Sequence, residues 1–456
     1  MIAGKPRTGT MILSAAESPR WRLGWDSRRS WKLGAELGWI LLGQALAATG
    51  AIVSVRWLTG YLNAAAYGEL ALGLTVSSLA QLVIVGPVAN GCLRFFAAAI
   101  EARTVATYLR AVGVIFLAAS AVLLLAMGGV TGCMLATGRK AWLALALSAT
   151  ALSWIGSGNS LLDGLQNAIR QRAIVAWHQA LGQWLRLFGA VGLMLLFGAR
   201  SSVAMWGYTL GAGAVLVSQI FFFRKKILVL RAPDLPQTPG AVAAAVRRIW
   251  AYGKSFALWG IFTWAHTSSD RWALTTFRNT RDVGLYQALY QVGYSPIYLL
   301  STLLTQLLVP ILFARAGDGL DHARLDKVRR LTNALVIPGV ALTAVAVTAS
   351  WLGRHTIFRL LTASSYHSVS GLLPWITLSA GLFSVGQIAT LGPMSEVDTR
   401  ALVAPKIVTA LLGLSLNCLG AFYLGLHGVI FAGIAFALLY FVWISSISNR
   451  RRHVAK

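Results

Sequence analysis

Charged side chains are missing from several long stretches of this chain, and each stretch is long enough to cross a lipid bilayer as a helix. Four pairs of charged residues bound the clearest of these stretches: Glu69 and Arg94, Arg110 and Arg139, Asp282 and Arg315, and Lys406 and Arg450. About 20 apolar residues span the hydrocarbon core as a helix. The pattern therefore predicts an all-α integral membrane protein.

The apolar stretches, divided at their charged and Gly/Pro-containing ends, predict twelve transmembrane helices. The expected spans are 36–58, 69–91, 108–130, 141–162, 174–197, 201–223, 250–276, 283–312, 331–352, 370–391, 403–424 and 427–446. An even number of spans places both termini on the same side of the membrane. Short basic loops favour the cytoplasmic side, so both termini are expected there.

The composition is typical of a membrane protein, and the positions of the basic residues argue against nucleic-acid binding. The chain is 57% hydrophobic, only 12% of its residues are charged, and its mean hydropathy is +0.66. The net charge of +26 could suggest a nucleic-acid-binding protein. The Lys and Arg residues instead lie at the ends of apolar runs, as the positive-inside rule predicts, so no nucleic-acid partner is expected.

A long charged connection after the sixth span divides the chain into two halves. We expect a cytoplasmic basic segment (1–34), a first lobe (35–223), a cytoplasmic linker (224–249), a second lobe (250–446) and a cytoplasmic basic tail (447–456). The segment that begins at Ala66 resembles the one that begins at Asp282, at an offset of about 216 residues. Two pseudo-symmetric six-helix lobes around a central cavity are therefore predicted.

Polar residues on the fifth span predict a cationic site in the first lobe. Arg172, Gln179, Gln183 and Arg186 lie seven, four and three residues apart and so share one helix face. An ionisable residue inside a span usually faces a cavity or a partner. Arg186 is expected at the base of the cavity, although a structural ion pair with Asp163 remains an alternative.

The seventh span carries the longest polar and aromatic stripe. Its members are Tyr252, Ser255, Trp259, Thr263, His266 and Asp270, and an adjacent stripe holds Phe256, Gly260, Trp264, Thr267 and Arg271. Aromatic faces beside hydroxyl groups suit a sugar or an amphipathic ligand. We expect the first stripe to face the space between the lobes, while ordinary helix packing remains the alternative.

Further polar positions complete the expected substrate site, in which Arg56 and Arg271 lie near the periplasmic mouth. The predicted cavity residues are Arg186, Gln183, Gln179, Arg56, Arg271, Asp270, His266, Thr263, Trp259, Trp264, Tyr252, Lys254, Gln291, Tyr294, Gln81 and Asn159. The sequence contains no Walker motif, Gly-rich phosphate loop or metal-ligand spacing. No enzymatic activity, cofactor or metal is therefore expected.

Several short motifs are distributed over residues 35–446: Leu58-Thr59-Gly60, Ala66-Tyr67-Gly68-Glu69-Leu70-Ala71-Leu72, Ser269-Asp270-Arg271-Trp272-Ala273-Leu274, Val283-Gly284-Leu285-Tyr286, Val309-Pro310, Leu416-Asn417-Cys418, His427-Gly428-Val429, Gly433 and Ala435. Together they resemble the polysaccharide transporter family, which includes the O-antigen and exopolysaccharide flippases of the multidrug, oligosaccharidyl-lipid and polysaccharide exporter superfamily. It implies two six-helix lobes and alternating access in a bacterial inner membrane. It also implies movement of undecaprenyl-diphosphate-linked oligosaccharide to the periplasmic leaflet.

The residues agree with this role, because a diphosphate needs cations and Arg supplies bidentate donors. Membrane lipids are expected partners, and a complex with a glycan polymerase or glycosyltransferase is possible. One alternative is a cation-coupled multidrug antiporter of the same superfamily, which would favour deep carboxylates. Another is a membrane glycan polymerase or assembly protein, which would require a long periplasmic loop.

Overall fold

The computed structural model describes residues 27–138, 142–169, 171–230, 239–316, 322–395 and 400–454, and these residues are almost entirely helical. Most of the predicted N-terminal segment (1–34), the middle of the predicted linker (231–238) and the last two residues of the predicted tail lie outside the described residues.

The first half of the chain forms the helices of one bundle, with a short π-helix inside the second span. Its elements are α1 (Ser27–Tyr61), α2 (Ala64–Ala80), η1 (Gln81–Val85), α3 (Gly86–Glu101), α4 (Val105–Ala136), α5 (Leu143–Ala168), α6 (Arg172–Phe197) and α7 (Ser201–Leu230).

The second half repeats this arrangement, again with a π-helix inside its second span. Its elements are α8 (Ala241–Gly253), α9 (Ser255–Phe277), α10 (Thr280–Leu289), η3 (Tyr290–Tyr294), α11 (Ser295–Ala316), α12 (His322–Leu361), the 3₁₀-helix η4 (Ser364–Leu372), α13 (Leu373–Ala389), α14 (Leu391–Ser395) and α15 (Arg400–Val454).

The predicted number of spans is confirmed once polar helices are included. Within the described residues, nine helical segments are long and apolar enough to span a bilayer. The helices α5 and α9, with 26 and 23 residues, are also long enough but carry many polar side chains. The long helix α15 is broken at Gly425, where φ is 59°, and its two halves return past each other with Gly420 against Gly428. Together these features give twelve membrane-length segments.

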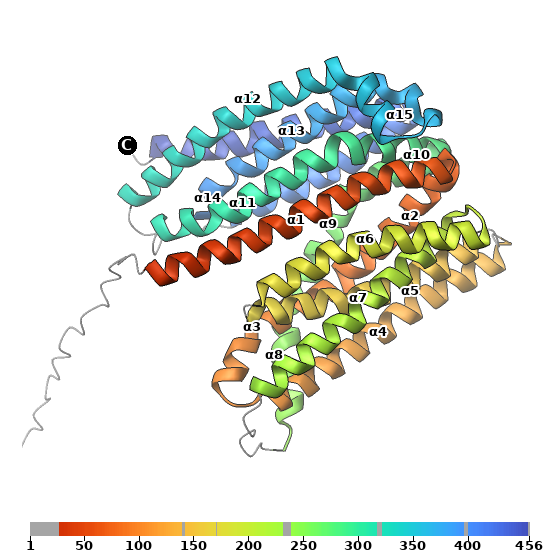
Figure 1. Ribbon diagram of the computed structural model, residues 1–456. Coiled ribbons are helices and arrows are strands. Elements are labelled where there is room, and N and C mark those ends of the chain that lie inside the picture. Colours follow the sequence, from red (N-terminus) through yellow and green to blue (C-terminus); the bar gives the residue numbers. More distant parts are fainter. Residues whose placement is uncertain are drawn as a thin grey trace, which may run out of the picture.

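Two bundles lie side by side, with α4, α5, α6 and α7 in one and α11, α12, α13 and α15 in the other (Figure 1). The helix α1 packs mainly against α6, and α9 contacts both α15 and the π-helix η1. The start of α1 and the end of α15 lie at the same end of the molecule (Figure 1). This arrangement agrees with an even number of spans.

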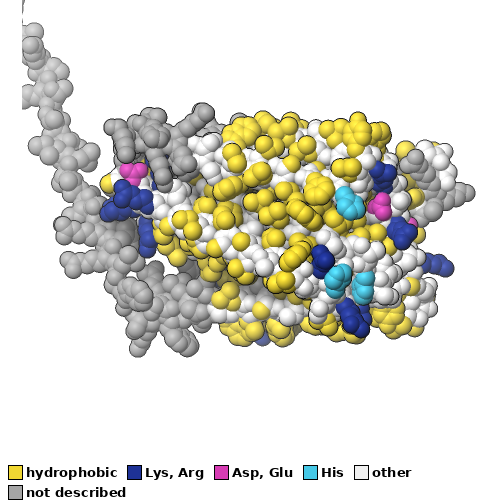
Figure 2. Space-filling view, turned by 90° about the horizontal axis from the view of Figure 1, so that it is seen from above, with side chains coloured by type: hydrophobic (Ala, Val, Ile, Leu, Met, Phe, Trp, Pro, Cys, Tyr) yellow, Lys and Arg dark blue, Asp and Glu magenta, His cyan; other side chains and the backbone are white. Residues whose placement is uncertain are grey.

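The outer surface is suited to lipid. Many large side chains are exposed, including Leu125 (77%), Leu196 (76%) and Ile337 (73%). Figure 2 shows one face, on which hydrophobic side chains form a broad central band and the charged and histidine side chains gather toward the two ends. A continuous apolar band of this size is unfavourable in water and matches the hydrocarbon core of a bilayer.

The two lobes meet where α2 crosses α10, and this contact reveals the internal repeat. Gly68 packs against the backbone of Gly284, and a Cβ atom at either position would overlap the facing backbone. Both helices also begin in the same way, since Asn63 caps α2 and Asn279 caps α10 by accepting a backbone hydrogen bond three residues on. The offset of 216 residues therefore relates structurally equivalent positions.

Side-chain hydrogen bonds strengthen the lobe contact at the end of the molecule where α1 finishes. Arg56 donates to the carbonyl oxygen of Thr362, and the Tyr366 hydroxyl donates to Leu62 O at 3.0 Å. The backbone N–H of Ala363 donates to Thr59 Oγ1 at 3.1 Å. The lobes are thus joined at the end opposite to the start of α1.

The predicted linker is partly helical. The helix α7 continues to Leu230, and α8 packs against α3 and α4 of the first lobe. Ile249 of α8 is buried, and its carbonyl oxygen lies against Gly91. A turn at Lys254 then separates α8 from α9, so the predicted seventh span begins with a break rather than as one straight helix.

Candidate functional site

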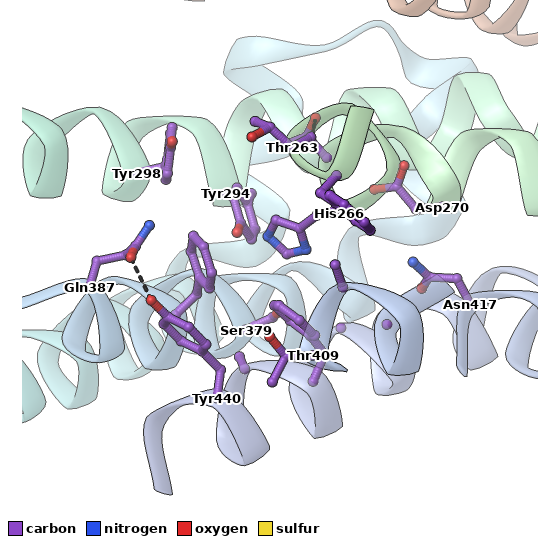
Figure 3. A pocket seen from close by; sticks show the side chains of 18 of the residues that line it. Thr263, His266, Asp270, Tyr294, Tyr298, Ser379, Gln387, Thr409, Asn417 and Tyr440 are labelled. Carbon is purple, nitrogen blue, oxygen red and sulfur yellow. Dashed lines mark hydrogen bonds between the residues drawn. The ribbon is translucent and has the colours of Figure 1, made fainter. Parts of the chain in front are cut away.

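A cavity of about 390 Å³ lies inside the second lobe, between α9, α10, η3, α11, α13 and α15. Its lining is mainly aromatic and aliphatic, with hydroxyl and amide groups at intervals. In Figure 3, Tyr294 and Tyr298 lie on one side, Gln387, Tyr440, Ser379 and Thr409 lie on the other, and His266 lies between them. This composition is typical of a site for a small molecule or a part of a larger one.

Stacked rings form much of the cavity wall. Tyr290 and Tyr294 stack with ring centroids 4.7 Å apart, and Tyr298 follows at 6.1 Å from Tyr294. The His266 ring lies between two phenylalanines, at 4.3 Å from Phe436 and 5.1 Å from Phe383. These contacts hold the rings in fixed positions, so the cavity is largely formed before a ligand binds.

Among the described residues of the cavity wall, one has a carboxylate, and this carboxylate is already fully engaged. Asp270 Oδ1 accepts from the Arg271 backbone N–H at 2.7 Å and from Arg271 Nη1 at 2.9 Å. Its Oδ2 accepts from the Tyr286 hydroxyl at 2.6 Å. Arg271 Nε also donates to Gln287 Oε1 at 2.8 Å, and its guanidinium lies 4.4 Å from the centre of the Tyr290 ring. The pair is therefore a satisfied buried ion pair, the arrangement that a low-dielectric interior requires.

A second group of polar side chains lies inside the first lobe, on α5, α6 and α7. Asp163 accepts from Gln219 Nε2 at 2.6 Å and from Gln179 Nε2 at 3.2 Å. Asn159 donates to the carbonyl oxygen of Ala212, and Gln166 donates to that of Gln219. Both backbone bonds span 53 residues, because α5 and α7 run parallel and in register.

Several atoms of this group lack a hydrogen-bond partner among the described residues. They are Asn159 Oδ1, Gln166 Oε1, Gln219 Oε1 and Arg186 Nε, and all four atoms are buried. Arg186 lies within electrostatic range of Asp163 and Tyr208, but no ion pair joins it to Asp163. Buried polar atoms usually have partners. The first lobe therefore contains an incompletely satisfied polar site around an arginine.

The structure brings only some of the predicted site residues together. Trp259, Thr263, His266, Asp270 and Tyr294 line the cavity of the second lobe. The prediction that this stripe faces the space between the lobes is wrong, because the cavity wall consists of second-lobe helices alone. Helical periodicity defines a face of α9 but does not say which neighbours cover that face.

Two residues of the adjacent stripe of α9, Gly260 and Trp264, contact the first lobe. Trp264 Nε1 donates to the carbonyl oxygen of Thr75 at 2.7 Å, and Gly260 packs against the backbone of Leu82. Trp264 is therefore part of the lobe contact rather than of the cavity wall. Tyr252 likewise lies outside the cavity, against Phe95 of α3.

The single cationic cavity predicted from Arg56, Arg186 and Arg271 does not form in this structure. Arg56 is exposed and donates to a backbone carbonyl of the second lobe, Arg186 lies inside the first lobe, and Arg271 is held by Asp270 inside the second. The three guanidinium groups lie in different environments because helix packing separates them. Sequence spacing predicted only how deep each one lies in the membrane, not which helices surround it.

The remaining predicted residues are dispersed. Gln179 donates to Asp163 and accepts from Gln44, and Gln183 lies against Gly50 of α1. Asn159 belongs to the first-lobe polar group, and Gln81 in η1 packs against Gly156 of α5. Lys254 is exposed at the turn before α9, and Gln291 accepts from Ser295.

The predicted site omitted most of the residues that line the cavity. Tyr298, Phe383, Gln387, Phe436 and Tyr440 line it, and the Tyr440 hydroxyl donates to Gln387 at 2.8 Å. The spacing of four residues between Tyr290, Tyr294 and Tyr298 could have identified the tyrosines. The lining residues of α13 and α15 gave no such signal. These helices are mainly apolar on every face, so the sequence does not show which face lines a cavity.

Comparisons with known proteins reveal the fold but no relative by sequence. No protein-family model matches the chain, and no curated protein matches it. Among the described residues, no cluster of three or more His, Cys, Asp or Glu side chains could hold a metal ion.

Solved membrane transporters share the fold. An inward-facing multidrug resistance MATE family transporter of the MOP superfamily is similar with a TM-score of 0.62 and 13% identity, over 91% of this chain and 96% of that one. A mutant of the Vibrio cholerae MATE transporter VcmN is similar with a TM-score of 0.62 and 12% identity, over 94% and 98%. The lipid II flippase MurJ in an inward closed conformation is similar with a TM-score of 0.60 and 10% identity, over 89% and 85%.

Proposed function

We propose that the chain is an alternating-access transporter that moves a lipid-linked oligosaccharide, carried on undecaprenyl diphosphate, from the cytoplasmic to the periplasmic leaflet of a bacterial inner membrane. The similarity to MATE transporters and to MurJ supports a transporter and does not distinguish between their substrates. The choice of an anionic substrate has to come from the residues of this chain.

The incompletely satisfied site around Arg186 carries the proposal. The Arg186 Nε atom is buried within a membrane-spanning helix and has no acceptor among the described residues. Holding a guanidinium in this environment costs several kcal/mol unless an anion compensates. A diphosphate would provide that compensation, because its oxygens accept the paired donors of arginine.

The lobe contact at one end supports a mechanism in which the two lobes separate and rejoin. In the proposed orientation, the bonds from Arg56 to Thr362 and from Tyr366 to Leu62 lie on the periplasmic side. The substrate would then load from the cytoplasm in this conformation. Release would require these bonds and the contact between Gly68 and Gly284 to open.

The proposal is tested by replacing Arg186 in cells from which the native gene has been deleted. We expect the deletion to cause accumulation of undecaprenyl-diphosphate-linked saccharide, measured by mass spectrometry of extracted lipids. Arg186→Ala should fail to reverse the accumulation, and Arg186→Lys should reverse it partly, because lysine lacks the planar paired donors.

The matched control is Arg200→Ala, which removes an exposed arginine between α6 and α7 of the same lobe. This variant should restore the wild-type lipid pattern at equal protein level in the membrane. Full reversal by Arg186→Ala, or a deletion without accumulated lipid-linked saccharide, would contradict the proposal.

A cation-coupled multidrug antiporter is the second candidate, and one observation favours it. The described residues of the cavity wall include many aromatic rings and no Lys or Arg, and aromatic ring faces attract organic cations. An antiporter should lower the accumulation of ethidium in cells, and cells without the gene should become more sensitive to such dyes. Dye export that survives Arg186→Ala would favour this candidate over the flippase.

A further inference from the structure

Four tyrosines recur at every fourth residue along one wall of the second-lobe cavity: Tyr286, Tyr290, Tyr294 and Tyr298. We call this set the tyrosine ladder. Consecutive ring centroids lie 6.1, 4.7 and 6.1 Å apart, so each ring contacts the next. The ladder crosses three elements in succession, namely α10, η3 and α11.

The π-helix keeps the ladder on one face. In a regular α-helix, four residues turn the chain by about 400°, so the first and fourth tyrosines would diverge by about 120°. A π-turn accommodates about one extra residue, which removes most of that divergence. The turn lies at Tyr290–Tyr294, where the N–H of Ser295 bonds back to Tyr290 O across five residues. The irregular turn therefore aligns all four rings toward the cavity.

The ladder presents hydroxyl groups rather than open ring faces. The rings of Tyr290 and Tyr294 are nearly parallel, at 14°, so their faces are covered by each other. Among the described residues, neither Tyr294 nor Tyr298 donates its hydroxyl to a side chain or a backbone carbonyl. The opposite wall adds the polar groups of Ser379 and Gln387.

The charge of the cavity selects against ionic ligands. Among the lining residues that the structure describes, none is Lys or Arg, so a diphosphate would find no counter-ion from them. The one carboxylate among these residues, Asp270, is neutralised by Arg271 and bonded by Tyr286, so an organic cation would not find a free charge either. An isoprenoid chain would offer the hydroxyl groups no hydrogen-bond partner, which is unfavourable for the polar groups that it covers.

We propose that the tyrosine ladder binds the uncharged saccharide part of the transported molecule, through the hydroxyls of Tyr294 and Tyr298 and the facing amide and hydroxyl groups. The identification of the ligand as part of a transported glycan rests on the proposed function. The two lobes then divide the substrate between them, with the phosphate near Arg186 and the sugar residues against Tyr294 and Tyr298.

The proposal is tested with the purified full-length protein in lipid nanodiscs, because glycosidic detergents would compete for the site. Saturation-transfer NMR would measure contacts with a panel of neutral tri- and tetrasaccharides built from hexoses and N-acetylhexosamines. We expect at least one of these to bind. Tyr294→Phe and Tyr298→Phe should each weaken binding about threefold to tenfold, since each removes one hydrogen bond and keeps the ring stack.

Tyr423→Phe is the matched control, because Tyr423 is 70% exposed and lies outside the cavity. This variant and Arg186→Ala should both retain the saccharide contacts. Tetraphenylphosphonium and inorganic pyrophosphate serve as charged probes, and neither should give a signal that depends on the two tyrosines.

Three results would overturn the proposal: no saccharide in the panel binds, binding is unchanged by both tyrosine variants, or tetraphenylphosphonium binds in a manner that depends on them. Failure of the Arg186 experiment in cells would leave a tyrosine-dependent saccharide site intact. Conversely, export that needs Arg186 but proceeds normally in the Tyr294→Phe and Tyr298→Phe double variant would overturn this proposal alone.

Discussion

Each lobe has an arginine within a membrane-length helix, and the two side chains have opposite environments. Arg271 in the second lobe has an ion pair with Asp270, a bond to Gln287 and a ring face from Tyr290. Arg186 in the first lobe keeps a buried Nε atom without an acceptor among the described residues. The two halves of the fold thus contain one arginine that is fully paired and one whose Nε atom has no acceptor among the described residues.

The largest expected effect comes from removing the satisfied arginine. Arg271→Ala would leave the Asp270 carboxylate buried without its counter-charge, which costs about 3–5 kcal/mol. We expect low yield in the membrane and a strongly lowered melting temperature, measured by fluorescence-detected size-exclusion chromatography. Arg281→Ala, an exposed arginine on α10, should behave like the wild type. Wild-type stability of Arg271→Ala would contradict a structural role for the pair.

A smaller loss of stability is expected when the glutamines that bond to Arg271 and Asp163 are replaced. Gln287→Leu removes the acceptor of Arg271 Nε and should cost about 1.5–3 kcal/mol, as for hydrogen bonds to charged groups. Gln219→Leu removes a donor to Asp163 but also removes an unsatisfied buried oxygen. It should therefore cost less than Gln287→Leu. Thermal melts of both variants measure which one loses more stability. A larger loss in Gln219→Leu than in Gln287→Leu would contradict the difference between the two polar sites.

The contact between the lobes should respond to a single methyl group. Gly68→Ala places a Cβ atom against the Thr280 carbonyl oxygen, and overpacking of this kind costs about 1–3 kcal/mol. The variant should shift the population away from the closed contact, measured by distances between spin labels on the two lobes. Gly60→Ala is the control, because no atom lies within 4 Å of its added Cβ. Unchanged distances in Gly68→Ala would remove this contact as a determinant of closure.

The smallest effect on stability is expected at Arg186 itself. Arg186→Met keeps most of the apolar stem and removes a charge that has no hydrogen-bond partner at Nε. Replacing a charge that is only partly compensated should leave the melting temperature unchanged or raise it slightly. The measurement is the same melt as for Arg271→Ala. A loss as large as that of Arg271→Ala would show that both arginines are structural.

The apolar stretches of the sequence, together with the polar residues at helical spacing, were enough to predict twelve spans. The two polar spans show why mean hydropathy alone does not identify every span. The helices α5 and α9 are not among the nine segments that pass as apolar spans, although both lie among the membrane-length helices. They carry Asp163, Asn159, His266 and Asp270, and they form the two polar sites. Their polar residues were recognised from helical spacing, which is a property of one helix alone.

The partners of those residues could not be predicted in the same way. The spacing of Gln179 and Arg186 indicated one face of α6, but only packing shows that Gln179 reaches Asp163 while Arg186 Nε does not find an acceptor. The same holds for Trp264, which was expected in the cavity and instead bonds to Thr75 of the first lobe.

The sequence by itself determined the membrane environment, the number of spans and the repeat, because burial in lipid and helical periodicity act within each segment. Only the tertiary structure decided that the cavity lies inside the second lobe, that Phe383 and Tyr440 belong to it, and that Arg271 is paired. These facts depend on which helices pack together. Lipid solvates apolar helices equally well on every side, so hydrophobicity alone does not select a partner.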